Sequence, residues 1–330
     1  MKNIVILATG GTIAGVSSSI TDTAGYEPAI LPIEEIIKNI TGPLRNLVHL
    51  SSEQIAQIDS AEMTHQIWLK LAQRINALLA SPAVDGIVVT HGTDTLEETA
   101  YFLNLVVKSA KPVVMVGAMR PASALSPDGP MNLYNAIILA ANDQASGKGV
   151  LVTLNNAINS SREVTKTNTS LQDTFKAPEL GYLGYLIEGE PYFYREPTRK
   201  HTWMTEFTVD GLTELPPVEI IYGHVGNLTT LPQAAAASGV KGLVYAGLGN
   251  GNMSQRMKDI FQEIQEQGVV VARSTRVSSG IVTRNGAVND DLSNFIVSDT
   301  LNPQKSTILL SLALTKTTDT AVIQRMFWEY

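Results

Sequence analysis

The chain of 330 residues carries 31 acidic and 24 basic side chains, so its net charge of -7 argues against nucleic acid or an anionic membrane as a partner. It contains no cysteine, which excludes a disulfide framework, a thiolate metal site and a cysteine nucleophile. No apolar run approaches the roughly 20 residues that span a bilayer, so the expected partner is a small molecule.

The first predicted strand is the apolar, β-branched run at residues 4–8, which suits a strand buried in a parallel sheet. It starts too early to leave room for a signal peptide, so the chain as given is expected to be cytoplasmic, or periplasmic if such a peptide was removed. Gly10 and Gly11 then permit a sharp turn that presents Thr12 beyond the carboxyl end of the strand, where α/β sheets bind ligands. Residues 16–26 are rich in Ser, Thr and Gly and form a candidate lid.

Strand and helix patterns alternate along the first half of the chain, which predicts a mostly parallel sheet with right-handed crossovers. Short apolar runs predict the strands, and apolar residues at helical spacing predict the helices. The predicted strands lie at residues 47–58, 86–90, 112–116 and 149–154, the helices at 32–40, 63–79, within 91–107 and at 129–141, and an edge hairpin at 183–194.

Two domains are expected, because the chain exceeds the length at which one hydrophobic core usually keeps growing. A polar stretch with three prolines, residues 197–217, is the predicted linker. It separates an α/β domain at 1–196, with a mixed but mostly parallel sheet flanked by helices, from a smaller α/β domain at 218–330 with a parallel sheet. The second domain has predicted strands at 218–222, 240–246 and 268–272, and predicted helices at 255–267, 306–315 and 320–328.

Polar clusters follow four predicted strand ends, and their convergence on one rim of the sheet would form a site. Helix capping would explain any one of them, and it is the main structural alternative for the third. A tight glycine turn is a further alternative for the first, and a solvated surface cation for the last. The clusters are Thr12, Asp59 with Ser60, Thr93 with Asp94, and Lys166.

A threonine hydroxyl is a weak nucleophile unless a neighbouring base accepts its proton. Lys166 could serve Thr93 in this way, with Asp94 holding the ammonium, and Tyr26 on the candidate lid could serve Thr12. Other chemistry has less support. The glycines lack dinucleotide and P-loop spacing, no two histidines lie three or four residues apart as in helical zinc sites, and no G-x-S-x-G elbow supports a serine triad.

Six segments, in order from end to end, resemble the bacterial type II L-asparaginases, including the glutaminase-asparaginases. The two threonine motifs among them are highly specific when both occur in one chain. The segments are TGGTIAG at 9–15, THGTDTLEETAYFL at 90–103, VGAMRP at 116–121, DGPMNLYNA at 128–136, TKTNTS at 165–170 and LNPQK at 301–305.

The resemblance implies a two-domain amidohydrolase that converts L-asparagine to L-aspartate and ammonia, acts to some degree on L-glutamine, and needs no metal or cofactor. Thr12 would attack the amide carbon and form a β-aspartyl ester that water hydrolyses, and Tyr26 would assist its deprotonation. Thr93, Asp94 and Lys166 match a second triad, in which the backbone N–H of Thr93 also helps to hold the developing oxyanion.

The same matching assigns substrate binding to Ser60, Ala61 and Asp94 at the α-carboxylate and α-amino end, and to the backbone around Ala118 at the amide end. Similar proteins are homotetramers, dimers of intimate dimers whose sites lie between the large domain of one subunit and the small domain of its neighbour. Asn252 would therefore reach the site of the neighbouring subunit.

Two positions depart from the family pattern. Ala61 follows the substrate-binding serine, where many members have Gln or Glu, and Ala287 stands where a glutamate from the neighbouring subunit would align. We expect weaker binding or an altered preference between the two amides without loss of chemistry, because all five central catalytic residues remain.

Three alternatives stay open. A primary glutaminase-asparaginase would differ in the ratio of kcat/KM for the two amides. A non-catalytic amino-acid-binding protein would release no ammonia from either, and a nucleotide-binding enzyme would bind adenine nucleotides saturably.

Overall fold

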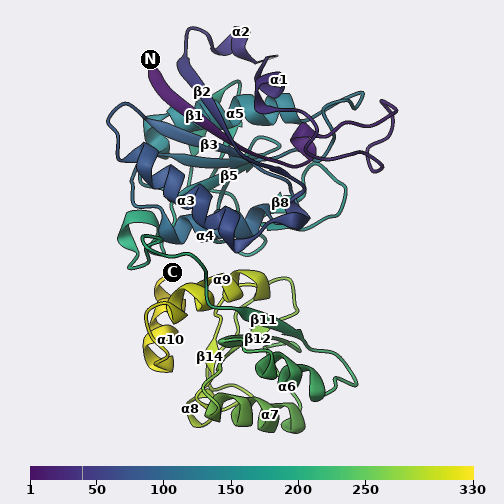
Figure 1. Cartoon of the computed structure of the whole chain (residues 1–330), viewed down its shortest axis with the longest axis vertical. Helices are drawn as coiled ribbons and strands as arrows, with labels where there is room; N and C mark the ends of the chain where they lie inside the picture. Colours follow the sequence, from purple (N-terminus) through teal and green to yellow (C-terminus); the bar gives the residue numbers. More distant parts are fainter. Residues whose placement is uncertain (39) are drawn as a thin grey trace. The chain divides into compact units, whose positions relative to one another are not determined.

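The computed structural model describes residues 1–38 and 40–330, which form two compact units, Met1–Thr213 and Glu214–Tyr330. Each unit is an α/β fold around its own sheet (Figure 1). Among the described residues, no helix has the length and apolar character needed to cross a bilayer.

The first unit contains an eight-stranded sheet. Its strands are β1 (Lys2–Gly10), β2 (Val48–Ile58), β3 (Gly86–Thr90), β4 (Val113–Val116), β5 (Val150–Leu154), β6 (Ala157–Ser160), β9 (Gly184–Ile187) and β10 (Glu190–Phe193). They lie in the order β10-β9-β6-β5-β4-β3-β1-β2, and the pairings from β2 to β5 are all parallel. Every residue of β3, β4 and β5 is buried, as expected for central parallel strands covered on both faces.

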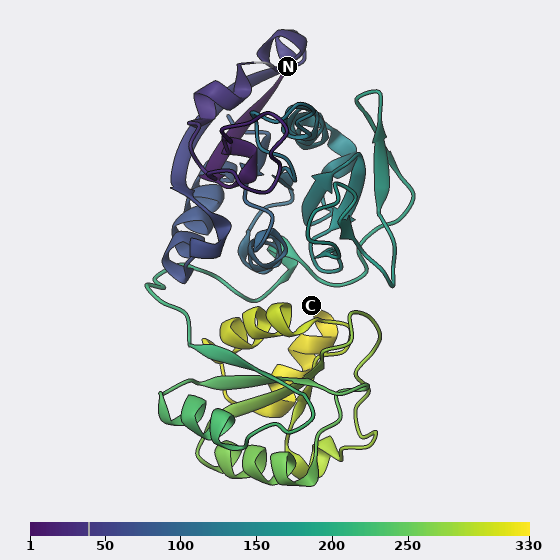
Figure 2. The same cartoon turned by 90° about the vertical axis from the view of Figure 1, so that its right-hand side faces the viewer.

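Helices cover both faces of this sheet (Figures 1 and 2). One face packs into a core with α5, α1 and α2, in which Ile6 and Val88 of the strands meet Leu133 and Ile137 of α5. The helices α3 and α4 lie on the other face, where Trp68 stacks on Phe102 with ring centroids 5.0 Å apart. The helices are α1 (Ile33–Ile37), α2 (Thr41–Leu44), α3 (His65–Leu79), α4 (Leu96–Val106) and α5 (Gly129–Ala141).

The predicted parallel strands and their helices are confirmed, with shifts of a few residues at their ends. The predicted helix at 32–40 is represented by α1, and its residue 39 lies outside the described residues. The predicted edge hairpin is β9 paired antiparallel with β10. Short 3-10 helices occur at η1 (Thr12–Ala14), η2 (Ser60–Glu62), η3 (Asp143–Ala145) and η4 (Thr202–Met204).

The sheet changes direction after β5, which the sequence pattern did not predict. Asn155 and Asn156 adopt φ values of 50° and 63° and connect β5 directly to the antiparallel strand β6. Two consecutive positive φ angles are what a two-residue hairpin turn requires, and Asn tolerates them well. A further two-stranded ribbon, β7 (Thr165–Lys166) with β8 (Phe175–Lys176), follows this reversal.

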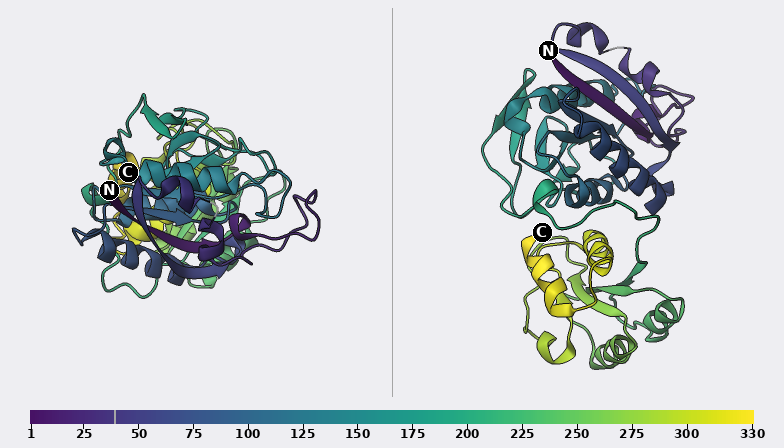
Figure 3. Two further views of the ribbon diagram at one scale, coloured as in Figure 1. Left: turned by 90° about the horizontal axis from the view of Figure 1, so that it is seen from above. Right: turned by 60° about the vertical axis from the view of Figure 1, so that its left-hand side comes forward.

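The second unit is built on a four-stranded parallel sheet in the order β11-β12-β13-β14. Its core brings Leu243 and Val271 of the strands against Phe261 of α7, while α9 and α10 lie on the opposite face (Figures 2 and 3). The short strand β14 and the alanine-rich α6 lack a periodic apolar pattern and were not predicted. The elements are β11 (Val218–Tyr222), β12 (Gly242–Gly247), β13 (Val270–Thr275), β14 (Ile296–Val297), α6 (Thr230–Ala237), α7 (Gln255–Glu266), α8 (Asp290–Ser293), α9 (Pro303–Leu314) and α10 (Thr320–Glu329).

Candidate active site

The glycine turn after β1 touches the turn after β3. Gly10 and Gly11 have φ angles of 106° and 82°, which L side chains rarely adopt. A Cβ atom on Gly11 would lie 2.2 Å from the Cα atom of Gly92, so only glycine permits the approach of the two backbones. This contact brings the segment that carries Thr12 beside the segment that carries Thr93.

Thr12 opens η1 with its side chain almost fully buried, and its hydroxyl lies 2.6 Å from the hydroxyl of Tyr26. The Tyr26 ring packs over Gly15, where a Cβ atom would come within 2.9 Å of the ring. Burial raises the pKa of Tyr26; the Thr12 hydrogen bond opposes the shift, and the carboxylates of Asp94 and Asp59 add to it. Tyr26 is therefore a neutral phenol at neutral pH, able both to donate and to accept a proton.

Hydrogen bonds hold together the two ends of the segment that runs from Thr12 to Tyr26. Val16 and Glu27 exchange two backbone hydrogen bonds of 2.9 Å each. Ser17 N donates to the Ser123 hydroxyl at 2.8 Å. The candidate lid is therefore a loop with fixed ends, and its motion stays a prediction.

Thr93, Asp94 and Lys166 form one hydrogen-bonded cluster. The Lys166 ammonium donates to Thr93 Oγ1 at 2.9 Å and to Asp94 Oδ1 at 2.6 Å. Thr93 is buried, whereas the Asp94 side chain is 62% exposed. The residue that caps α4 is Thr95, and its side chain makes no capping bond. Neither Thr93 nor Asp94 serves as the N-cap, and Lys166 is more than a solvated cation.

Glu97 supports this cluster through hydrogen bonds to the segment that carries Lys166. The sequence pattern did not reveal this residue. Its carboxylate is almost fully buried and accepts from Lys166 N at 2.7 Å and from the Thr165 hydroxyl at 2.8 Å. The first turn of α4 thereby anchors β7, the strand that carries the lysine. In the sequence Glu97 reads only as an acidic residue at a helix start, a signal that does not name its distant partner.

Ser60 lies against the same cluster. Its buried hydroxyl accepts from Asp94 N at 3.3 Å, and its carbonyl oxygen accepts from the Thr95 hydroxyl at 2.8 Å. The neighbouring Ala61 is exposed and donates its N–H to the Asp59 side chain, which caps η2. Ser60 and Asp94 are thus brought together, while the side chain of Ala61 is a bare methyl group at the surface.

Ala118 follows β4 and is completely buried. The next two backbone N–H groups, of Met119 and Arg120, each donate to the Asp128 carboxylate at 2.9 Å. Asn132 joins this knot by donating to Gly117 O at 3.1 Å. Asp128 and Asn132 therefore fix the backbone around Ala118, a role that their place in the DGPMNLYNA segment did not reveal.

A pocket of about 330 Å³ opens beside this machinery and is lined by Asp94, Lys166, Thr167, Asn168 and Thr169. In residues 1–38 and 40–330, no group of three or more His, Asp or Glu side chains is arranged to hold a metal ion. A space of this size next to a lysine and a carboxylate is suited to a small polar molecule.

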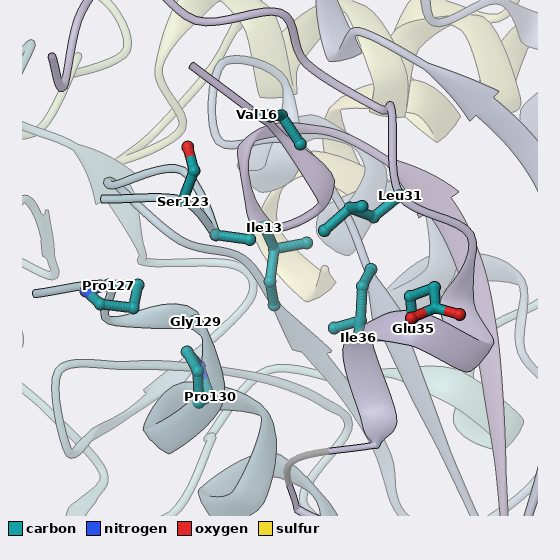
Figure 4. Close-up of a pocket in the computed structure, with 10 residues that line it drawn as sticks. Ile13, Val16, Leu31, Glu35, Ile36, Ser123, Pro127, Gly129 and Pro130 are labelled. Carbon is teal, nitrogen blue, oxygen red and sulfur yellow. The ribbon is translucent and has the colours of Figure 1, made fainter. Parts of the chain in front are cut away.

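A second, largely apolar pocket of about 250 Å³ adjoins η1 (Figure 4). Ile13, the residue after Thr12, forms one wall, and Leu31 and Ile36 form another. Its polar lining consists of Ser123 and the half-exposed Glu35, which already pairs with a lysine.

Comparison with known proteins identifies the family. A model of the asparaginase N-terminal domain matches residues 3–199, and one of the glutaminase/asparaginase C-terminal domain matches residues 217–327. The chain belongs to the asparaginase family. "L-asparaginase 2" of Bacillus subtilis is 51% identical over the whole chain and 87% of its own length, and "Glutaminase-asparaginase" of Pseudomonas fluorescens is 46% identical over the whole chain and 91% of its length.

A crystal structure of a probable cytoplasmic L-asparaginase from Campylobacter jejuni superposes with a TM-score of 0.97, at 45% identity and with full coverage of both chains. The two-domain α/β fold expected from the sequence is therefore the fold of this asparaginase-family chain.

The remaining two candidate residues, Asn252 and Ala287, lie in the second unit of this asparaginase-family protein. Asn252 closes a tight loop by exchanging backbone hydrogen bonds of 2.9 and 2.7 Å with Leu248. Its Oδ1 atom is buried and finds no donor within the described part of the chain. Ala287 is exposed.

Arg273, which sequence reasoning missed, holds both of these segments. Its guanidinium forms two bonds of 2.6 and 2.8 Å with the Asp290 carboxylate, and both side chains are fully buried. It also donates to the carbonyl oxygens of Asn250, Gly251 and Thr283 at 3.0 to 3.2 Å. The buried pair thus fixes the backbone next to Asn252 and Ala287.

Proposed function

We propose that this protein hydrolyses the side-chain amide of L-asparagine, and to a lesser degree that of L-glutamine, with Thr12 as the nucleophile. The observation that carries the proposal is the contact of Gly11 with Gly92, which sets the Thr12 and Tyr26 hydroxyls beside the cluster around Thr93 in an asparaginase-family chain. Two relatives with these names, an L-asparaginase and a glutaminase-asparaginase, support the substrate class.

In the first step, Thr12 Oγ1 adds to the amide carbon and its proton passes to the Tyr26 hydroxyl, 2.6 Å away. Because Tyr26 is a neutral phenol, it passes its own proton to the amide nitrogen as it accepts this one, and the nitrogen leaves as ammonia when the C–N bond breaks. The negative charge that develops on the amide oxygen is held by the backbone N–H of Thr93.

In the second step, the oxygen of a water adds to the carbonyl carbon of the β-aspartyl ester and the bond from that carbon to Thr12 Oγ1 breaks. One proton of the water passes through the Tyr26 hydroxyl to Thr12 Oγ1, so that L-aspartate and the Thr12 hydroxyl are released. The Lys166 ammonium donates to one lone pair of Thr93 Oγ1 and so holds this hydroxyl in place, and the second lone pair can accept a hydrogen bond from that water and position it. Asp94 keeps Lys166 in place through the bond of 2.6 Å and also serves, with Ser60, the charged end of the amino acid.

We further propose a homotetramer in which the second unit of one subunit completes the site of its neighbour, with Asn252 as the contributed side chain. The unpaired, buried Oδ1 atom of Asn252 supports a role beyond its own subunit. Mixing an inactive Thr12→Ala chain with an inactive Asn252→Leu chain should restore part of the activity, and sedimentation should give the mass of four chains.

One relative is named periplasmic and another cytoplasmic, so the family is compatible with either cellular compartment.

The decisive experiment is steady-state ammonia release from both amides by the wild type, Thr12→Ala and the exposed control Thr41→Ala. We expect Thr12→Ala to lose at least about 1,000-fold in kcat, in line with removal of a nucleophile, and the control to match the wild type. Wild-type turnover by Thr12→Ala would remove Thr12 from the nucleophile role.

Release of no ammonia from either amide by the wild type would favour an amino-acid-binding protein instead. A second candidate, a primary glutaminase-asparaginase, is favoured by the relative of Pseudomonas fluorescens with that name. A kcat/KM for L-glutamine that equals or exceeds the value for L-asparagine would establish it.

A further inference from the structure

His91 is completely buried at the end of β3, directly before the Gly92–Thr93 turn. Its ring makes one hydrogen bond with each nitrogen. Nδ1 lies 2.7 Å from the carbonyl oxygen of Gly92, and Nε2 lies 2.8 Å from the hydroxyl of Thr99. The same hydroxyl accepts from the indole N–H of Trp68 at 2.7 Å.

The chemistry of these partners fixes the direction of every bond. A carbonyl oxygen can only accept, so Nδ1 of His91 must carry the proton. Burial, only partly opposed by the bond to Gly92, lowers the pKa of His91 to about 4, so the ring is neutral and Nε2 is bare. Thr99 therefore donates to Nε2 while it accepts from Trp68, and the direction of every hydrogen bond from Trp68 to Gly92 is fixed.

The last hydrogen bond of this series, from His91 to Gly92, controls the orientation of one peptide group. The Gly92 carbonyl and the Thr93 N–H belong to the same peptide, and in a trans peptide they point in opposite directions. A donor that binds the Gly92 carbonyl oxygen therefore fixes the direction of the Thr93 N–H on the opposite side of the peptide. It also polarises the peptide, which makes this N–H a stronger hydrogen-bond donor. Within the described residues, the Thr93 N–H has no acceptor of its own.

We propose that His91, as its Nδ1–H tautomer, is a positioning residue that holds the Gly92–Thr93 peptide so that the Thr93 N–H meets the oxyanion of the reaction. The inference rests on the proposed function, because it assigns a purpose to a donor that the hydrolysis of an amide requires. His91 does not touch the substrate, and it acts through the peptide that it holds.

Two variants of similar size separate this role from packing. The amide of His91→Asn stands near the position of Nδ1 and can still donate to Gly92, whereas the longer His91→Gln stands near Nε2 and can reach only Thr99. We expect His91→Asn to stay within about threefold of the wild-type kcat and His91→Gln to lose about 30-fold, less than the 100- to 1,000-fold for removal of a whole oxyanion donor. KM should change less than kcat in both.

A matched control is His201→Asn. His201 is the other buried histidine of the first unit, and its Nδ1 atom lies 3.0 Å from the Thr202 hydroxyl. Its ring packs on Gly149 at the amino end of β5, whereas the candidate site lies at the carboxyl ends of the strands. Its replacement should lower the melting temperature without lowering kcat. Equal kcat losses in His91→Asn and His91→Gln, or no loss in either, would overturn the proposal, as would losses confined to KM.

A direct measurement does not depend on turnover. The ¹⁵N shifts of the His91 ring in the wild type report which nitrogen carries the proton, and we expect Nδ1. A proton on Nε2 would overturn the inference even in an active enzyme. If the wild type released no ammonia while Nδ1 was protonated, the proposed function would fail and the hydrogen-bond chain would stand. If His91→Gln does not fold, Thr99→Val replaces it, with an expected kcat loss of about fivefold, and an unchanged kcat would contradict the proposal.

Discussion

Two ion pairs in this chain each join a basic side chain to an aspartate, but they differ in their exposure to solvent. The side chains of Lys166 and Asp94 are 18% and 62% exposed, whereas those of Arg273 and Asp290 are 1% and 0% exposed. All five N–H groups of Arg273 have acceptors, three of them backbone carbonyls, so the buried pair has no capacity left for a ligand. Lys166 holds a buried hydroxyl and a carboxylate that is 62% exposed, and this pair lines a pocket that a ligand could enter. Water access therefore separates the pair suited to chemistry from the pair suited to structure.

The largest effect should come from the accessible pair. We expect Lys166→Met to lower kcat about 1,000-fold, equivalent to about 4 kcal/mol, because Thr93 loses its orienting donor. The free energy of unfolding should change by less than about 1 kcal/mol, as for other partly exposed pairs. Lys176→Met, which removes an exposed pair with Asp173, is the control and should leave both quantities near wild type. A large stability loss with little change in kcat would erase the contrast between the pairs.

The buried pair should behave in the reverse way. Arg273→Met leaves the Asp290 carboxylate buried without its partner and should lower the free energy of unfolding by about 3–5 kcal/mol. Arg74→Met is the matched control, because Arg74 forms the same two-bond contact with Glu53 at the surface, and it should cost less than about 1 kcal/mol. Chemical denaturation measures both, and equal losses would show that burial is not the deciding variable.

A buried neutral ring offers a third test, through pH. Burial holds the pKa of His91 near 4, while an unfolded histidine titrates near 6.5. Between these values the unfolded chain binds more protons, so stability present above pH 6.5 is lost as the pH falls toward 4. The expected loss is about 3 kcal/mol. Denaturation of the wild type and His91→Asn at pH 7 and pH 4 measures it, and equal acid sensitivity of the two proteins would refute the assignment.

The smallest effects should arise at the exposed positions that lack a polar partner. Ala61→Gln and Ala287→Glu each restore one hydrogen-bonding group, which is worth about 1 kcal/mol and should lower the KM for L-asparagine about fivefold. Ala83→Gln places the same side chain at an exposed position before β3 and should have no effect. An unchanged KM in both restored variants would mean that the two alanines do not limit binding.

The sequence predicted the parallel core of the first unit well, because β3, β4 and β5 are short apolar runs with polar groups at their carboxyl ends. The parallel topology then places Thr12, Ser60 and Thr93 on one rim without further information. The place of Tyr26 on the candidate lid and the family resemblance both suggested it as a partner of Thr12, but nothing in the local pattern determines where a long loop returns.

The supporting residues could not be predicted from local patterns. Glu97 and Asp128 are acidic residues at helix starts, where their charges already have an explanation, and their actual partners are distant backbone N–H groups. Arg273 lies inside a strand whose other residues give no hint that its guanidinium is sealed against Asp290. The two asparagines at 155 and 156 are typical turn residues, but the strand that follows them is only four residues long and is succeeded by a polar segment.

The contact between Gly11 and Gly92 has a consequence for how such a site can change. Neither position has room for a side chain, since a Cβ atom on Gly11 would overlap the backbone of Gly92 and one on Gly92 would lie 2.6 Å from the Ser60 hydroxyl. A graft of either threonine loop must therefore keep glycine at both positions, because an added side chain at residue 11 or 92 would meet a steric clash. Libraries that seek new amide substrates are better directed to residues 61 and 287, where the surface has room for variation.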